Sequence, residues 1–316
     1  GRVSSLFVYP MSFDEFLTAT GQEGLLRTKR NSSPMNPLPE AFYNRLVEAF
    51  RSYMLVGGMP EAVATYTETG SYRYSSDIVN EIIQGYQDDF AKYGAKANPL
   101  LLRQTLISVA HQAGAKFVYS RVEGQYRSAE VKVALEMLKD AGLIIPTYHT
   151  DANGVPLGAE INERVVKYLI HDTGVLLGIL GIDDDIDERI KEMMVADSID
   201  LVDKGHVAEM MAGLELIKYS SPQTRHQLYY WQNMNKGTCA EVDYVIARSG
   251  SIVPIEVKSG VKGSMSSMYS LMRNPQKHIE MGIRCSLENF GTFASPDGKK
   301  IDIIPLYAIS NLFAEK

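Results

Sequence analysis

Hydrophobic and polar residues alternate along two neighbouring segments in the C-terminal half of the chain, 241–246 and 253–258. An alternation with a period of two predicts β-strands that bury one face. The segment between them contains Ser249 and Gly250, which suit a two-residue turn. The pattern therefore predicts a β-hairpin whose register is set by this turn.

Charged side chains come together on one face of the predicted hairpin. Counting outward from the turn places Asp243 opposite Glu256 and Glu241 opposite Lys258, and opposite residues have Cβ atoms about 5 Å apart. The pair of Glu241 and Lys258 is favourable, whereas Asp243 facing Glu256 costs stability unless a positive charge lies between them. Carboxylates are the ligands that Mg²⁺ prefers, so we expect a divalent cation, Mg²⁺ or Mn²⁺, at this point.

Helical spacing of apolar residues dominates the N-terminal part of the chain. It predicts helices at about 39–56 and 75–93, and the glycines and proline of the intervening "GGMPEA" break the helix. Before them, the segment 1–17 has the pattern of a strand followed by a helix, and a stretch rich in proline and serine at 31–39 is typical of a linker. We expect a helical segment at 39–95.

From about residue 98 the pattern changes to helix, short extended piece, helix and hairpin. The second helix spans about 128–141, and the hairpin is expected to turn at Asn153 and Gly154. Helices followed by a β-wing resemble a winged helix, which we place at 96–162.

Two functions are open for this winged-helix unit. As a DNA reader it would place the helix 128–141 in the major groove, with Arg121, Arg127 and Lys132 making contacts. The same helix is also acidic, and the tip of the wing has no Lys or Arg, although phosphate binding needs several basic contacts. A protein-binding or purely structural role is therefore favoured. The acidic residues of the helix are Glu130, Glu136 and Asp140.

Glu209 stands out on the long helix predicted before the hairpin, because its neighbours on the helix surface are Ala212, Gly213 and Leu216. A carboxylate in such surroundings needs a partner, since burying it unpaired is costly. The alternative is a half-exposed glutamate at a packed edge. His206 lies one turn away, but a single histidine at a helix start is more often a cap or a surface residue than a metal ligand.

Composition narrows the class of protein. The chain has 316 residues, 45% of them hydrophobic, which is enough for two or three units with cores of their own. Its net charge of −6 argues against a strongly basic nucleic-acid binder, although a local basic surface remains compatible with it. The sequence contains no run of about 18 apolar residues, so it predicts no membrane span. Two cysteines, Cys239 and Cys285, favour a reducing, cytoplasmic location.

A glutamate on a helix, followed by Asp243 and then by Glu256, Val257 and Lys258, resembles the motif of the PD-(D/E)xK nuclease superfamily, which has the restriction-endonuclease-like fold. Over essentially the whole chain, the order of short motifs resembles that of bacterial and archaeal AAA-type ATPases with an uncharacterised nuclease-like domain in their C-terminal half. These motifs are "GRVSSLFVYPMSFDEFL", "GGMPEAV", "HDTGVLLGILG", "YYWQ", "EVDYVI", "PIEVKSG" and "IDIIPLYAI".

The resemblance implies an α/β (α+β) fold in which a restriction-endonuclease-like mixed sheet is flanked by helices. Residues 1–38 would be the tail of an upstream ATPase domain and a linker, ahead of the helical segment and the winged-helix unit. Residues 163–316 would be the nuclease-like domain. The sequence contains no G-x-x-x-x-G-K-[ST], so ATP would bind only through a domain outside this chain.

The resemblance also assigns roles to residues. Asp243 and Glu256 would hold Mg²⁺, Glu209 would add a ligand or orient water, and Lys258 would position the attacking water and neutralise phosphate. DNA would be the substrate. The alternative is a non-catalytic nuclease-fold module that regulates or targets the ATPase, because a fold does not imply a function. Oligomeric state and cellular role are not indicated by the sequence.

Overall fold

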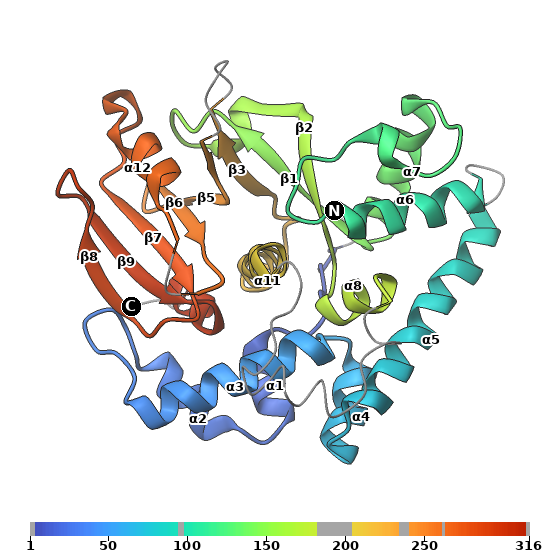
Figure 1. The fold of residues 1–316 in the computed structure, drawn as a ribbon, viewed down its shortest axis with the longest axis horizontal. Coiled ribbons are helices and arrows are strands. Elements are labelled where there is room, and N and C mark those ends of the chain that lie inside the picture. Colours follow the sequence, from blue (N-terminus) through green and yellow to red (C-terminus); the bar gives the residue numbers. More distant parts are fainter. Residues whose placement is uncertain (1–3, 94–97, 182–203, 234–239, 261–262, 314–316) are drawn as a thin grey trace.

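The structure is a computed structural model that describes residues 4–93, 98–181, 204–233, 240–260 and 263–313. It is an α+β fold, as expected from the sequence, and its strands form two open sheets (Figure 1). One sheet has four strands in the order β2-β1-β3-β4, and the other has five in the order β5-β6-β7-β9-β8. The helix α11 (Lys204–Lys218) lies between the two sheets (Figure 1).

The N-terminal helices pack against one another below the sheets in the view of Figure 1. The predicted helix at 39–56 is confirmed, and a further helix that the sequence analysis missed begins at Pro60, where proline is tolerated in the first turn. Residues 4–10 form no strand, so that expectation was wrong. The helices are α1 (Phe13–Ala19), α2 (Glu23–Arg30), α3 (Glu40–Val56), α4 (Pro60–Thr69) and α5 (Tyr72–Phe90).

Two helices and a hairpin follow, in the order expected for the winged-helix unit. The helices are α6 (Pro99–His111) and α7 (Ser128–Asp140), and the hairpin consists of β1 (Ile144–Thr150) and β2 (Ile161–Ile170) in antiparallel pairing. The connection between the strands is longer than the predicted two-residue turn, because residues 151–160 include a 3₁₀ turn. β1 also pairs in parallel with β3 (Leu228–Gln232), so this hairpin is part of the four-stranded sheet.

The strand β2 continues past residue 162 and enters the part of the chain expected to form the nuclease-like domain. After α8 (Thr173–Ile179) and α11, the chain forms β3 and then the very short β4 (Glu241–Val242), which pairs with β3. The second sheet comprises β5 (Tyr244–Arg248), β6 (Ser251–Val257), β7 (Met281–Ser286), β8 (Gly291–Ala294) and β9 (Lys300–Pro305), with α12 (Ser266–Arg273) between β6 and β7.

The predicted hairpin is confirmed as β5 and β6. Arg248 pairs with Ser251, and both turn residues have positive φ, +50° at Ser249 and +76° at Gly250. This is the backbone that a tight two-residue turn requires, and it is the reason for glycine at the second position. The remaining pairs of the second sheet are parallel between β6, β7 and β9 and antiparallel between β8 and β9, so the sheet is mixed.

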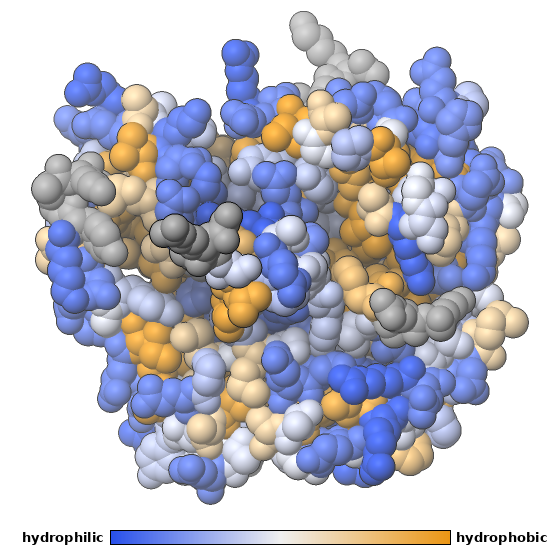
Figure 2. All heavy atoms as spheres, turned by 180° about the vertical axis from the view of Figure 1, so that it is seen from behind, coloured by the Kyte–Doolittle hydropathy of each residue, from blue (hydrophilic) through white to orange (hydrophobic). Residues whose placement is uncertain are grey.

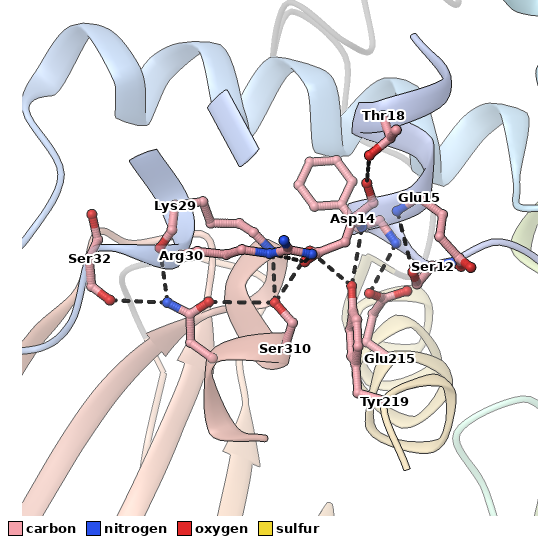
Figure 3. A network of polar contacts seen from close by, with 12 residues as sticks. Ser12, Asp14, Glu15, Thr18, Lys29, Arg30, Ser32, Glu215, Tyr219 and Ser310 are labelled. Carbon is pink, nitrogen blue, oxygen red and sulfur yellow. Dashed lines mark hydrogen bonds and ion pairs between the residues drawn. The ribbon is translucent and has the colours of Figure 1, made fainter. Parts of the chain in front are cut away.

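A buried polar network fastens the N-terminal helices to α11 and to the last helical turn, η5 (Leu306–Leu312) (Figure 3). Lys29, which is fully buried, forms an ion pair with Asp14 and donates a hydrogen bond to Ser310 at 2.7 Å. Tyr219, the residue that follows α11, donates to Asp14 at 3.0 Å, and Glu215 on α11 accepts the N–H of Phe13 at 3.2 Å. Each buried charge in this network thus has a partner, as buried charges require.

The face seen in Figure 2 carries hydrophobic residues in several separate patches among hydrophilic ones. Apolar side chains scattered in this way are normal on a protein surface. None of the described helices is long and apolar enough to cross a membrane.

Candidate functional site

The residues singled out in the sequence come from three elements. Glu209 is on α11, Asp243 is the residue between β4 and β5, and Glu256 is near the end of β6. Lys258 directly follows β6. Because β4 belongs to the first sheet and β5 to the second, Asp243 lies where the chain passes from one sheet to the other.

The side chain of Asp243 is fixed by the backbone of the neighbouring strand. Its Oδ2 accepts a hydrogen bond from the N–H of Val257 at 2.7 Å. Val257 lies between Glu256 and Lys258 in the sequence, so this bond holds Asp243 beside both of them. Burial raises the pKa of Asp243, against the opposing effects of the Val257 N–H and of two lysines.

Glu256 is buried, and only one of its two carboxylate oxygens has a hydrogen-bond partner among the described residues. Its Oε1 accepts a hydrogen bond from Lys258 Nζ at 2.6 Å, so these two side chains lie on the same face, as predicted. Its Oε2 is buried and has no hydrogen-bond partner among the described residues. Burial, and then the negative charge of Asp243, raise the pKa of Glu256 to about 7, with Lys258 opposing.

A second lysine, which the sequence analysis did not consider, lies at the centre of the cluster. Lys167 on β2 is 1% exposed, and its Nζ donates to Glu209 Oε1 at 2.8 Å and to Glu241 Oε1 at 2.5 Å. The ammonium group also lies over the ring of Tyr230, 5.0 Å from its centre, in a cation–π contact. Lys167 therefore joins β2, α11 and β4.

This arrangement corrects one prediction. Glu241 does not pair with Lys258. It pairs with Lys167, because β4 turns away from β6 to pair with β3, where Glu241 lies opposite Gln232. The prediction assumed one continuous strand from Glu241 to Arg248, and the break at Asp243 ends that register.

The two lysines provide the positive charge that the crowded carboxylates require. With every group ionised, four carboxylates and two ammonium groups leave a charge of about −2 instead of the −3 obtained without Lys167. Burial alone would lower the pKa of Lys167, but Glu209 and Glu241 raise it above its usual value. One ammonium cannot compensate two carboxylates, so the more deeply buried Glu209 takes up a proton easily, and burial raises its pKa to about 8.

The segment 98–162 reaches this cluster through the loop after α6. Gly114 has φ +74°, and a Cβ at this position would lie 2.7 Å from the ring of His206 and 3.2 Å from Glu209 Oε2. Only glycine fits both this backbone and this close approach. His206 itself is exposed, and it contributes to no metal-binding group among the described residues.

The described residues contain no group of three His, Cys, Asp or Glu side chains arranged to hold a metal ion. Two carboxylates with further positions left to water and phosphate are nevertheless a suitable set for Mg²⁺. The free Oε2 of Glu256 beside Asp243 fits this set. Glu209 fits it less well, because its Oε1 already accepts from Lys167.

Comparison with known proteins divides the chain into two parts. Residues 47–186 match the domain of unknown function DUF8612. Residues 204–309 match DUF4143. DUF4143 is also a domain of unknown function, found in proteins associated with AAA-type ATPases. No curated protein and no solved structure matches the chain. The DUF4143 match contains Glu209, Asp243, Glu256 and Lys258, whereas Lys167 lies in the DUF8612 match.

Lys167 was missed although the sequence carries a signal for it. It is the one charged residue in the run Val165–Ile170, which is buried throughout. A lone lysine in an otherwise apolar strand must find a buried carboxylate. The sequence could thus have indicated that a partner exists, although not that Glu209 and Glu241 would share the role.

Proposed function

We propose that the DUF4143 part of this chain is a nuclease-like module with a Mg²⁺-dependent phosphodiesterase site of the PD-(D/E)xK type, acting on DNA in a protein associated with an AAA-type ATPase. One observation carries the proposal. Asp243, held by the Val257 N–H at 2.7 Å, lies beside Glu256, whose buried Oε2 has no partner among the described residues. A buried carboxylate oxygen without a partner is costly, and a cation would compensate it.

Asp243 and Glu256 would hold the metal ion, which supplies charge neutralisation at the scissile phosphate when bound. Lys258 lies at 2.6 Å from Glu256 and is partly exposed, so its ammonium group can contact a phosphate or position a water molecule. Glu209 holds Lys167 in place, and Lys167 in turn fixes Glu241 beside Asp243. In this arrangement Glu209 acts by positioning its neighbours, not as a primary metal ligand.

The test is cleavage of supercoiled plasmid and of single-stranded DNA by the complete protein with Mg²⁺ or Mn²⁺ and ATP. We expect cleavage by the wild type, and its loss by at least about a hundredfold, the size of effect that removal of a charge-stabilising group has in other enzymes, in Asp243→Asn and in Lys258→Ala. Asp297→Asn is the matched control, because Asp297 is exposed and pairs only with Arg273 among the described residues. Cleavage that is equal in all variants, or absent in the wild type, would contradict the proposal.

A second function is favoured by a different observation. Lys167 and Lys258 already pair with Glu209, Glu241 and Glu256, so most of the cluster is neutralised from within the protein. Such a cluster suits a non-catalytic module that docks on or regulates an ATPase. This alternative predicts a folded, stable wild type that cleaves neither DNA substrate and binds no divalent ion at the cluster.

A further inference from the structure

A polar cavity of about 280 Å³ lies at the carboxyl ends of β1 and β3. These two strands pair in parallel, so their carboxyl ends meet at one edge of the four-stranded sheet (Figure 1). The short turn η4 (Pro275–Lys277), which follows α12, closes the cavity on another side. Its lining includes Asp151, Asn153, Trp231, Gln232, Asn274 and Lys277.

The cavity is next to the candidate nuclease-like site. Gln232, which lines the cavity, lies opposite Glu241 in the ladder between β3 and β4. Opposite residues of an antiparallel ladder have side chains on the same face, about 5 Å apart at Cβ. Glu241 in turn forms the ion pair with Lys167 at the centre of the cluster. The cavity and the cluster are therefore separated by a single pair of strands.

Two side chains in the cavity have hydrogen-bonding groups without a partner among the described residues. The side-chain amide of Gln232 forms no hydrogen bond, since only the backbone C=O of this residue accepts one, from His149. Lys277 is 9% exposed, and its Nζ donates to the C=O of Asp151 and, at 2.9 Å, to Asn153 Oδ1. Because an ammonium group has three N–H donors, one remains for a ligand.

The charges of the lining argue against a phosphate in this cavity. Asp151 and Lys277 contribute one charge of each sign, and the other lining residues among those described are uncharged. Phosphate binding needs an excess of basic groups. The cavity therefore suits an uncharged ligand that offers both hydrogen-bond donors and acceptors to Gln232 and Lys277.

An aromatic ring completes the lining and indicates a nucleobase. Trp231 is 8% exposed and is the only tryptophan of the chain. A nucleobase is a planar, uncharged ring with donors and acceptors along its edge, and proteins bind unpaired bases through aromatic contacts and hydrogen bonds to that edge. Ligand pockets start at about 300 Å³, so this cavity accommodates one base and not a base pair.

We propose that this cavity binds an unpaired nucleobase of the DNA strand whose phosphate contacts Asp243 and Glu256. Gln232 and Lys277 form hydrogen bonds with the edge of the base, and Trp231 contacts its ring. The inference rests on the proposed function and narrows its substrate to DNA with unpaired bases, because a base inside a duplex cannot present its edge to a cavity.

The test uses the tryptophan fluorescence of the chain, which reports on this cavity alone because Trp231 is the only tryptophan. The chain is titrated in EDTA, so that no metal-dependent cleavage occurs, with a single-stranded oligonucleotide of about ten nucleotides, within the site sizes of single-strand binders. We expect saturable quenching. A strand of abasic nucleotides keeps the sugars and phosphates, and we expect it to bind at least about tenfold more weakly, the equivalent of about 1.4 kcal/mol. A fully paired hairpin should bind more weakly by a similar factor.

A variant tests the residue that reads the edge of the base. Gln232→Leu keeps the size of the side chain and removes its amide, so it should weaken binding of the single strand at least about tenfold. Gln276→Leu is the matched control, because Gln276 is exposed on η4 and is not among the residues that line the cavity. We expect it to bind the single strand as the wild type does.

The inference is overturned if the single strand causes no quenching, if the abasic strand or the hairpin binds as tightly as the single strand, or if Gln232→Leu binds as the wild type does. Cleavage of DNA in the assay above without this quenching would overturn the inference and leave the proposed function standing. Quenching with the expected preferences, but without cleavage, would support the base-binding cavity and contradict only the proposed function.

Discussion

At the scale of single residues, the candidate site is defined by burial of charge. Four carboxylates share two ammonium groups, and one of these carboxylates, Glu209, is only 7% exposed. Its environment raises its pKa to about 8, so near neutral pH the folded protein binds a proton that the unfolded chain has already released.

This raised pKa predicts a dependence of stability on pH. A carboxyl group whose pKa is higher in the folded state contributes stability that is fully present below the unfolded value, near pH 4.5, and is lost as the pH rises through about 8. We therefore expect the free energy of unfolding to fall between pH 5 and pH 8. Urea titrations of the wild type and of Glu209→Gln measure it, and the variant should show a flatter pH profile over this range. Parallel profiles for the two proteins would contradict the assignment.

At the scale of elements, Lys167 ties together β2, α11 and β4, which the sequence separates widely. Removing one partner from a buried ion pair leaves an uncompensated charge, which typically costs about 3–5 kcal/mol. Lys167→Met should therefore lower the free energy of unfolding by about this amount at pH 8. At pH 5, where Glu209 is protonated, we expect a smaller loss.

The double variant Lys167→Met, Glu209→Gln separates charge from packing. If the uncompensated charge of Glu209 causes the loss of stability, the double variant should be more stable than Lys167→Met alone. We then expect a coupling energy of at least about 1 kcal/mol in the double-mutant cycle. Additive effects of the two substitutions would show that Lys167 contributes by packing alone.

The helices and strands observed in the structure show which features the sequence pattern could predict. The period-two pattern and the turn residues placed β5, β6 and the register of Arg248 with Ser251 correctly, because a tight turn fixes register locally. Helical spacing placed α3 and α7 for a similar reason, since each buries one stripe. It also placed α11, although every residue from Val207 to Ile217 is buried. These features depend on neighbours in the sequence.

The predictions that were wrong concern features that depend on contacts between distant segments of the chain. The break at Asp243 follows from the pairing of β4 with β3, and the partner of Glu241 comes from β2, 74 residues earlier. No local pattern specifies such pairings. The helix α4 was missed because the glycines at 57 and 58 were taken to end all helical structure, whereas Gly57, with φ +79°, only ends α3 and lets α4 start at Pro60.

At the scale of the whole molecule, α11 connects the candidate site to the N-terminal helices. It carries Glu209 in its N-terminal half and Glu215 in its last turn. Glu215 and Tyr219, which follows the helix, belong to the network with Asp14 (Figure 3). The loop that contains Gly114 packs against the same helix, next to His206 and Glu209. The DUF8612 and DUF4143 matches therefore meet at Lys167 and Glu209, one residue from each.

The central claim is that Asp243 and Glu256 together bind a divalent cation. Isothermal titration calorimetry of the chain with Mg²⁺, and separately with Mn²⁺, at pH 8 tests it most directly. We expect binding to the wild type with a stoichiometry of about one, as a single two-carboxylate site implies, its loss in Asp243→Asn and in Glu256→Gln, and its retention in Asp297→Asn. Absence of binding to the wild type, or equal binding to all four proteins, would contradict the account and favour the non-catalytic module.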